Sequence, residues 1–440
     1  MRELVEKMME RGEMLYVDRE VDPRFELAAV VARSQKESDL PILFRSVRGT
    51  RFPVVSNIYG SNRRLREMVG AGDANLCRRW AEIMRTMDAM GSDYLRVIAS
   101  PEPLESGVIA DLPQITWREK DAGPYITAGV FLAKDPDTGV PNLSFARTWM
   151  TGNDEMLCCI DPVHDLGNYQ ARAEARGEPL DIAILIGAPP EIFIAGCASV
   201  PIDVDELKVA AAIRGHALPM RRCSHVDLLV PESTEVVIEG RILPNVRRKE
   251  GPFGEYMGYY GRETDGYVIQ VLSVTWRRDP LYHGLLCGTP EDLTVLDVAF
   301  ATKTYRALSD VPGVLDVTCN PMLYCSVVSI DKRYEGHPQQ VMLKTFGASP
   351  YYNYMCIVVD KDVDIRNMKE VMWAYLTRGR LDRRIMVIPD VPGWELDKNP
   401  IYGGRIGIDA TMPLDRRDEF ERTSTPGESE INLKDYVTRQ

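Results

Sequence analysis

Two glutamates flank a turn-forming segment in EGPFGEYMGYYG, residues 250–261. Glu250 and Glu255 lie five positions apart, and on a straight strand that spacing places side chains on opposite faces. The Gly-Pro-Phe-Gly segment between them is typical of a tight turn, which lets both carboxylates converge. Paired carboxylates repel each other, so in a buried site the pKa of one rises and it can donate a proton near neutral pH. The alternative interpretation is an exposed polar hairpin connection.

A second group of residues has the composition of a metal site. In NLSFARTWM, residues 142–150, Asn142 and Arg147 bracket an apolar stretch, and His164 follows in IDPVHDLG. An amide, an imidazole and a carboxylate together suit a divalent cation, above all one that also touches a phosphate. A single histidine is more often a structural residue than a metal ligand. Asp161 and Asp165, close to His164 in the sequence, are alternative ligands.

Glu206 lies in VDELKVAAAIRG, where Asp203 or Asp205 is placed to cap a helix. Glu206 then falls in the first turn of this helix. There it can serve as a metal ligand, or it can simply stabilise the positive end of the helix dipole. The residues themselves leave both interpretations open.

Composition narrows the class of protein. The chain has 440 residues, 45% of them apolar, and a formal charge of -12 with a pI near 5.2. This charge argues against nucleic acid or an anionic membrane as the main partner, since both need clustered basic residues. No apolar run approaches the roughly 20 residues that cross a bilayer. The nine cysteines form no CxxC pair, which favours a reducing, cytoplasmic compartment.

The pattern along the chain predicts a multidomain protein of α/β and α+β type. Helical periodicity and short β-rich runs predict an N-terminal α/β domain over residues 1–115. Many short strands predict a central β-barrel or sandwich over residues 116–288. Thr289 and Pro290 mark the start of a linking helix, 289–310. Residues 311–440 alternate strands and helices as a C-terminal α/β domain, with a polar tail from about Asp415.

Four segments together resemble the UbiD family of reversible decarboxylases, which use prenylated FMN. They are EGPFGEYMGYYG, NLSFAR, DELKVAAAIRG and GGRIGIDATMP, and the similarity covers most of the chain. The resemblance implies a central split β-barrel that binds the flavin. It also implies non-oxidative decarboxylation of an aromatic, heteroaromatic or α,β-unsaturated carboxylic acid, through a covalent adduct with the cofactor and proton transfer by a glutamate.

Carried onto this sequence, the resemblance assigns the site residues. Arg147, Glu250 and Glu255 become the catalytic network, with Glu255 as the acid/base. Manganese, which links the protein to the flavin phosphate, is bound by Asn142, His164 and Glu206. The residues implied in cofactor binding are Asn142, Leu143, Ser144, Phe145, Ala146, Arg147, Val163, His164 and Glu206. Family members also hold potassium near a segment matching 198–201.

The resemblance implies partners as well. A flavin prenyltransferase of the UbiX type would supply the cofactor, and further copies of the chain would form a homodimer or homohexamer through the C-terminal domain.

The sequence departs from the family at three points. The interval from Arg147 to His164 is about one residue shorter, and a cofactor-contacting lysine is replaced by Ala348 or Ser349. Tyr256 follows Glu255, at a position that borders the substrate in relatives.

Two other functions remain open on the sequence. One is a non-catalytic or accessory subunit of a multi-subunit carboxylase, against which the intact Arg147, Glu250 and Glu255 argue. The other is an FMN-binding reductase-like module, because a split β-barrel that binds a flavin phosphate also suits redox chemistry.

Overall fold

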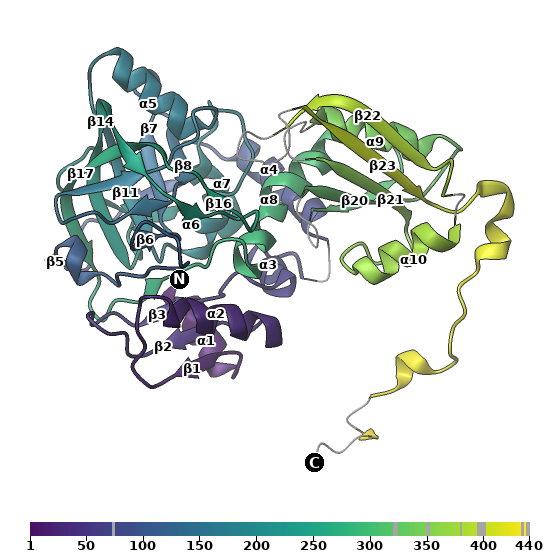
Figure 1. The fold of residues 1–440 in the computed structure, drawn as a ribbon, viewed down its shortest axis with the longest axis horizontal. Coiled ribbons are helices and arrows are strands. Elements are labelled where there is room, and N and C mark those ends of the chain that lie inside the picture. The colour runs from purple at the N-terminus through teal and green to yellow at the C-terminus, as the bar shows by residue number, and fades with distance from the viewer. Residues whose placement is uncertain are drawn as a thin grey trace.

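The N-terminal region combines a small sheet with four helices in the computed structural model, which describes residues 1–72, 75–319, 324–348, 353–378, 381–393, 402–432 and 435–436. The sheet order is β1-β2-β3-β18, so its fourth strand comes from much later in the chain (Figure 1). The elements are α1 (Arg2–Glu10), β1 (Leu15–Val17), α2 (Glu26–Glu37), β2 (Ile42–Phe44), β3 (Val54–Ser56), α3 (Asn62–Met68), α4 (Leu76–Ala89) and β18 (Tyr282–His283).

The central region is a sheet of nine strands curled into a half-barrel, in agreement with the split β-barrel that the family resemblance implies. Its order is β6-β9-β10-β17-β14-β11-β7-β8, with β5 paired to β17. The strands are β5 (Glu105–Gly107), β6 (Tyr125–Ile126), β7 (Val130–Lys134), β8 (Pro141–Phe145), β9 (Thr148–Trp149), β10 (Glu155–Cys158), β11 (Leu180–Ile186), β14 (Val236–Glu250) and β17 (Thr264–Trp276). The long antiparallel pair β14 and β17 forms its spine, and register shifts after Glu239 and Ile242 bend this pair.

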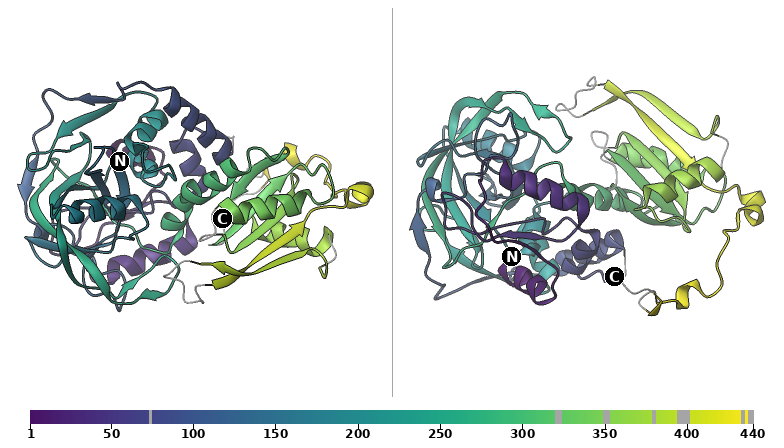
Figure 2. Two further views of the ribbon diagram at one scale, coloured as in Figure 1. Left: turned by 90° about the horizontal axis from the view of Figure 1, so that it is seen from above. Right: turned by 60° about the horizontal axis from the view of Figure 1, so that its bottom comes forward.

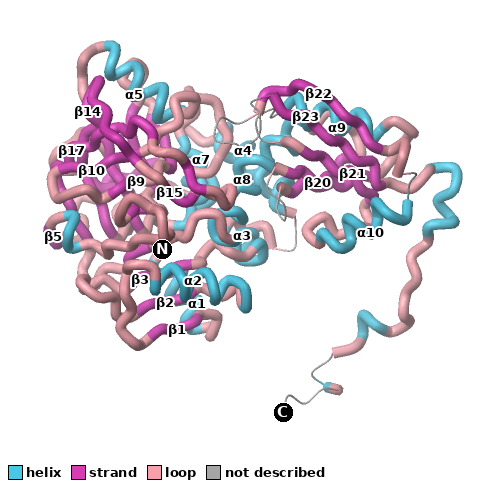
Figure 3. Tube along the Cα trace, in the orientation of Figure 1, coloured by secondary structure: helices cyan, strands magenta, loops and turns pink. Residues whose placement is uncertain are grey.

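Smaller elements close the central region. Helices α5 (Asp165–Ala175) and α7 (Glu206–Arg214) pack beside the curled sheet (Figure 3), and α6 (Pro190–Ala195) packs against α7. A separate sheet contains β4 (Leu95–Val97), β12 (Leu218–Arg222) and β13 (Leu229–Pro231), and a two-stranded pair contains β15 (Phe253–Gly254) and β16 (Tyr260–Gly261). A short 3-10 helix, η1, spans Ile109–Asp111.

The linking helix α8 (Pro290–Ala307) runs from the central region to the C-terminal domain (Figure 1). It begins with Thr289 as N-cap and Pro290 in the first turn, as the sequence predicts. The Thr289 side chain does not cap the helix, however; its hydroxyl donates to Leu286 O at 2.6 Å. The carboxylate of Asp292 in the first turn reaches back past the N-cap and accepts from Gly288 N at 2.8 Å.

A buried carboxylate on α8 joins it to the N-terminal domain and to β18. The side chain of Glu291 is fully buried and accepts hydrogen bonds from the backbone N–H groups of residues 57–59 and from Ser56 Oγ. His283 Nε2 lies 3.0 Å from its Oε1. A buried charge is tolerated only when its hydrogen bonds are satisfied, so this network holds the start of α8 in place.

The C-terminal domain is a five-stranded sheet between helices. Its order is β19-β20-β21-β23-β22, in which β20, β21 and β23 are parallel. The elements are β19 (Val314–Thr318), β20 (Cys325–Ile330), α9 (His337–Ala348), β21 (Met355–Asp360), α10 (Met368–Arg378), β22 (Ile385–Pro392) and β23 (Tyr402–Ala410). Beyond it, η2 (Leu414–Phe420) and η3 (Glu428–Glu430) lie on a tail that leaves the body of the molecule (Figures 1 and 2). In the part of the chain that is described, no helix combines the length and apolarity needed to cross a bilayer.

Candidate active site

Arg147 lies between Glu250 and Glu255, the two glutamates of the EGPFGEYMGYYG segment. Its Nε and Nη2 donate to the two carboxylate oxygens of Glu250, at 3.1 and 2.7 Å, and its Nη1 donates to Glu255 Oε1. Glu250 is fully buried, and only about a tenth of the Arg147 and Glu255 side chains is exposed. One guanidinium therefore bridges two carboxylates in an almost enclosed site, a geometry for which arginine's planar fork is suited.

The turn between the glutamates creates this arrangement. Glu250 is the last residue of β14, and Gly251 then adopts a φ of +93°, which favours glycine. Two further glycines lie directly against the carboxylates. A Cβ atom at Gly266 would lie 2.5 Å from Glu250 Cβ, and one at Gly261 would lie 3.0 Å from Glu255 Oε1. The glycines of this region thus provide the space that the two acids occupy.

A break between two strands turns Arg147 toward the glutamates. Strand parity places Asn142 and Arg147 on opposite faces unless the segment bends, and the sequence does not locate the bend. In the structure β8 ends at Phe145 and β9 begins at Thr148, so the chain leaves regular strand geometry at residues 146–147. This interruption is the bend between Asn142 and Arg147 that the sequence does not locate.

Burial shifts the protonation equilibria of this group. Desolvation raises the pKa of Glu255, and the charge of Arg147 opposes the shift while Glu250, Asp292 and Asp121 add to it. Desolvation alone disfavours the Arg147 cation, yet its hydrogen bonds to Glu250 and the charge of Glu255 outweigh this effect, so the pKa of Arg147 is raised. The site therefore pairs a permanent cation with a carboxyl group that retains its proton to a higher pH than usual.

Tyr125 belongs to this network, although sequence reasoning missed it. Its hydroxyl donates to Glu250 Oε1 at 2.9 Å, and Glu250 thereby receives a third hydrogen bond. Tyr125 is buried in β6 and lies 125 positions before Glu250. The segment YITAG looks like any apolar strand, so no local signal marks this tyrosine. Its ring also packs against Phe253, with centroids 4.7 Å apart.

The second candidate group forms around Glu206. Asp205 caps α7 through Leu207 N at 2.7 Å, and Glu206 is the first residue of this helix. The buried Glu206 carboxylate accepts from Asn142 Nδ2 at 3.0 Å and from Leu143 N at 3.3 Å. Burial, with help from the nearby Asp165, raises the pKa of Glu206 to about 8. A buried carboxylate with this pKa is one that a cation would stabilise.

The remaining predicted residues lie around these two groups. His164 is exposed and is the N-cap residue of α5, directly before Asp165, whose charge helps to raise the pKa of Glu206. Val163 is 71% exposed. Along the 142–147 segment, Leu143 and Ala146 are buried, Ser144 is half-buried and donates to Asn142 Oδ1, and Phe145 is 38% exposed. Ala348 is the last residue of α9, and Ser349 lies outside the described residues.

The residues around Glu206 supply some of the donor atoms that a divalent cation needs. The described residues contain no group of three or more His, Cys, Asp and Glu side chains placed to hold a metal ion. Asn142 and Glu206, which are in contact, supply an amide and a carboxylate oxygen, and the N-terminus of α5 brings His164 and Asp165 to the same region. Oxygen donors with one imidazole match the preferences of manganese or magnesium.

Comparisons with family models cover nearly the whole chain. The N-terminal domain of 3-octaprenyl-4-hydroxybenzoate carboxy-lyase matches residues 5–84, its Rift-related domain matches 102–290, and its C-terminal domain matches 293–410. The chain belongs to the UbiD family. It is 34% identical over 433 residues to the anhydromevalonate phosphate decarboxylase of Methanothermobacter thermautotrophicus, with 96% of this chain and 99% of that protein covered.

Solved structures of UbiD-class enzymes have the same three-part architecture. HmfF from Pelotomaculum thermopropionicum, in complex with FMN, superposes with a TM-score of 0.91 at 33% identity, and 99% of each chain is covered. The vanillic acid decarboxylase of Sedimentibacter hydroxybenzoicus is 26% identical over 98% of this chain and 96% of its own. Its open form gives a TM-score of 0.86 and its closed form 0.79.

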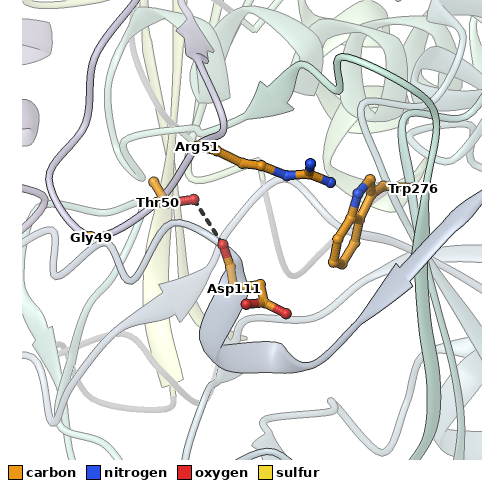
Figure 4. A pocket seen from close by; sticks show the side chains of 5 residues that line it. All are labelled: Gly49, Thr50, Arg51, Asp111 and Trp276. Carbon is orange, nitrogen blue, oxygen red and sulfur yellow. Dashed lines mark hydrogen bonds between the residues drawn. The ribbon is translucent and has the colours of Figure 1, made fainter.

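A shallow hollow of about 500 Å³ lies elsewhere, where the N-terminal region meets the central sheet (Figure 4). Gly49, Thr50, Arg51, Asp111 and Trp276 line it. Its polar groups are engaged: Arg51 pairs with Glu105, Trp276 Nε1 donates to Glu105 Oε2 at 3.1 Å, and Thr50 Oγ1 donates to Asp111 O at 2.8 Å. The hollow contains none of the predicted site residues.

Proposed function

We propose that this UbiD-family protein is a prenylated-FMN-dependent decarboxylase of an aromatic, heteroaromatic or α,β-unsaturated carboxylic acid. The observation that carries the proposal is the buried Arg147, which bridges Glu250 and Glu255. A non-catalytic family member would have no need for two buried carboxylates and a guanidinium, whose desolvation costs several kcal/mol per ion.

The chain's own residues have distinct roles in this proposal. When bound, prenylated FMN supplies an electrophilic centre that accepts the electrons left after carbon dioxide departs. Glu255, whose pKa is raised by burial, donates the proton that replaces the lost carboxylate on the substrate carbon. Arg147 orients Glu255, and Glu250 and Tyr125 hold Arg147 in position. The enclosed site keeps water away from the reacting carbon.

The cofactor phosphate requires its own anchor, and we assign it to the Glu206 region. Asn142 and Glu206 would hold a manganese ion, with His164 from the N-terminus of α5 as third ligand, and that ion would neutralise the phosphate charge. The 142–147 segment and Val163 would lie along the cofactor. The FMN in the HmfF structure and the prFMN in its evolved dimeric form, at 32% identity and a TM-score of 0.88, support a flavin here.

Tyr256 would form part of the wall of the substrate site. It directly follows Glu255, and its hydroxyl lies 3.0 Å from the hydroxyl of Tyr324 in the C-terminal domain. The substrate region is therefore bordered by both the central and the C-terminal domains. An aromatic boundary of this kind favours a planar, unsaturated acid.

The proposed assembly is a homo-oligomer in a reducing compartment such as the cytoplasm. All nine cysteines are free thiols, and the C-terminal domain exposes apolar side chains on β22 and β23. A prenyltransferase of the UbiX type would supply the cofactor. The functional units of this proposal are the N-terminal domain, the flavin-binding domain, the linking helix and the C-terminal domain, over residues 1–115, 116–288, 289–310 and 311–440.

Co-expression with a UbiX-type flavin prenyltransferase tests the function directly. The purified chain should contain a flavin with the mass of prenylated FMN, release carbon dioxide from at least one unsaturated acid, and incorporate deuterium from heavy water at the vacated carbon. Plain FMN together with redox activity would instead indicate a reductase-like module. A chain that binds prenylated FMN yet decarboxylates nothing without other subunits would be an accessory subunit.

A further inference from the structure

One face of α8 is only partly buried along its whole length. Asp292, Leu296, Ala299, Lys303 and Arg306 follow one another at spacings of four, three, four and three residues, and each is half-buried or exposed. This spacing places them in one stripe on the helix. The residues of the other faces, such as Val298, Ala301 and Thr304, are fully buried.

Each end of this stripe contacts a segment of the central region. At its start, Asp292 accepts from Gly288 N, and a Cβ atom at Gly288 would lie 3.2 Å from Glu255 O. At its end, Arg306 Nη2 donates to Ser199 O at 3.4 Å. Ser199 belongs to the segment between α6 and α7, just before Glu206.

The same segment also borders the predicted cofactor strand. A Cβ atom at Gly196 would lie 3.1 Å from the ring of Phe145, which is partly exposed. The stripe on α8 therefore extends from the residues next to Glu255 to the segment between α6 and α7, which borders Phe145 and leads to Glu206. Asp292 and Lys303 are separated by about 16 Å along the helix axis. That length is comparable with a flavin mononucleotide from its ring edge to its phosphate.

The distal end of the stripe carries two positive charges without a counterion. In the described part of the chain no carboxylate pairs with Lys303 or Arg306, whereas the buried Lys332 pairs with Glu335 at 2.8 Å. Burial lowers the pKa of Lys303, and the neighbouring Arg306 lowers it further. Two adjacent cations, one half-buried, are unfavourable unless an anion accompanies them.

We propose that Lys303 and Arg306 form a binding site for a phosphate group, contributed by the linking helix. The proposal rests on the proposed function, because the phosphate it would bind first is that of the flavin, for which Asn142 and Glu206 are the proposed metal ligands. A phosphate on the substrate would have the same chemistry. Neither residue contacts the reacting atoms, so both serve in binding.

Flavin titration measures this site without turnover. Purified apoprotein would be titrated with FMN and with riboflavin, which lacks the phosphate, and flavin fluorescence would report the dissociation constants. We expect Lys303→Met and Arg306→Met to weaken FMN binding about tenfold or more and to leave riboflavin binding unchanged. Lys303→Arg keeps the charge and should restore FMN binding. Lys36→Met on the exposed face of α2 is the control with the same change of charge.

Each outcome decides the proposal. If FMN binding is unaffected but the KM for a phosphorylated unsaturated acid rises in both Met variants, with no such rise for its dephosphorylated analogue, the site binds the substrate's phosphate. If neither changes, or if riboflavin binding weakens as much as FMN binding, the site does not bind phosphate and the proposal is wrong. Failure of the wild-type protein to bind any flavin would count against the proposed function. If the wild type binds FMN and the two Met variants bind it equally well, only the phosphate site is contradicted. Melting temperatures close to wild type exclude misfolding.

Discussion

At the scale of single residues, the candidate site is defined by how one guanidinium serves two carboxylates. Glu250 receives hydrogen bonds from Arg147 and Tyr125 and is fully buried. Glu255 receives a hydrogen bond from Arg147 and lies at the edge of the site, where burial raises its pKa. In the proposed function, these different surroundings suit Glu250 to orient Arg147 and Glu255 to exchange a proton.

Glu255→Gln should retain flavin and lose turnover. The amide keeps the size of the side chain but has no proton to donate, so kcat should fall by a factor of about 10² to 10⁴. Flavin content, measured by absorbance, and carbon dioxide release are the two readouts. Glu263→Gln is a matched control, because Glu263 is an exposed glutamate in the same region. Substantial turnover in Glu255→Gln would remove Glu255 from the role of acid.

The pH dependence of turnover should follow the raised pKa of Glu255. The protonated carboxyl group is the donor, so kcat should be highest at low pH and fall as the pH rises through the pKa of this group. Because burial raises that pKa, the midpoint should lie above the usual glutamate range of about 4.3. A profile of kcat between about pH 5 and pH 9 measures it. A profile without an alkaline decline would contradict this role.

At the scale of elements, two helix N-termini hold the site together. The first turn of α7 presents Glu206 to Asn142 of β8, and the first turn of α8 presents Glu291 to residues 57–59 and Asp292 to Gly288. In each case an acid in the first turn of the helix links it to another part of the chain. Carboxylates are favoured at this position by the helix dipole.

Manganese should stabilise the protein through Glu206. A cation held by Asn142 and Glu206 would give the buried Glu206 carboxylate a positively charged partner. Adding Mn²⁺ to apoprotein should raise the melting temperature of the wild type and not that of Glu206→Gln. Glu67→Gln, which alters an exposed glutamate on α3, is the control and should respond to manganese as the wild type does. An equal response of Glu206→Gln would undo this ligand assignment.

Glu291→Ala should loosen the joint between α8 and the N-terminal domain. It removes the shared acceptor of three buried N–H groups, and each buried donor left without a partner costs about 1–3 kcal/mol. Thermal unfolding should shift to clearly lower temperature, and hydrogen exchange at residues 57–59 should accelerate. Glu291→Gln retains one acceptor oxygen and should have a smaller effect. Unchanged exchange at these amides in Glu291→Ala would contradict the prediction.

At the scale of the whole molecule, α8 connects a curled sheet with a separate α/β domain (Figure 1). The C-terminal domain has its own core on both faces of its sheet. The hydroxyl groups of Tyr256 and Tyr324 lie 3.0 Å apart and link this domain to the residue that follows Glu255. In the proposed function, the substrate would therefore be bordered by both parts.

Val387→Asp should disrupt self-association. Val387 on β22 is 66% exposed and pairs with the exposed Ile406 of β23, while Ile385 lies two positions away on the same face. Such an apolar stripe on an edge strand is suited to cover by a second copy of the chain. Light scattering after size exclusion should show an oligomer for the wild type and a smaller species for the variant. Val97→Asp, at an exposed valine of β4, is the control, and an equal loss of assembly there would show that the stripe is not the interface.

Local features of this protein follow from neighbouring residues. The EGPFGE turn and the start of α8 at Thr289 and Pro290 could be predicted in this way, and the family resemblance rests on such segments. For the cap of α7 the sequence offers Asp203 or Asp205, and the structure shows Asp205. The partners across the chain follow from the tertiary structure alone. Tyr125 reaches Glu250, Glu291 reaches residues 57–59, and Arg306 reaches Ser199 over separations of more than 100 positions. Periodicity shows which face of an element is polar, but not which distant segment will cover that face, because packing depends on the entire chain.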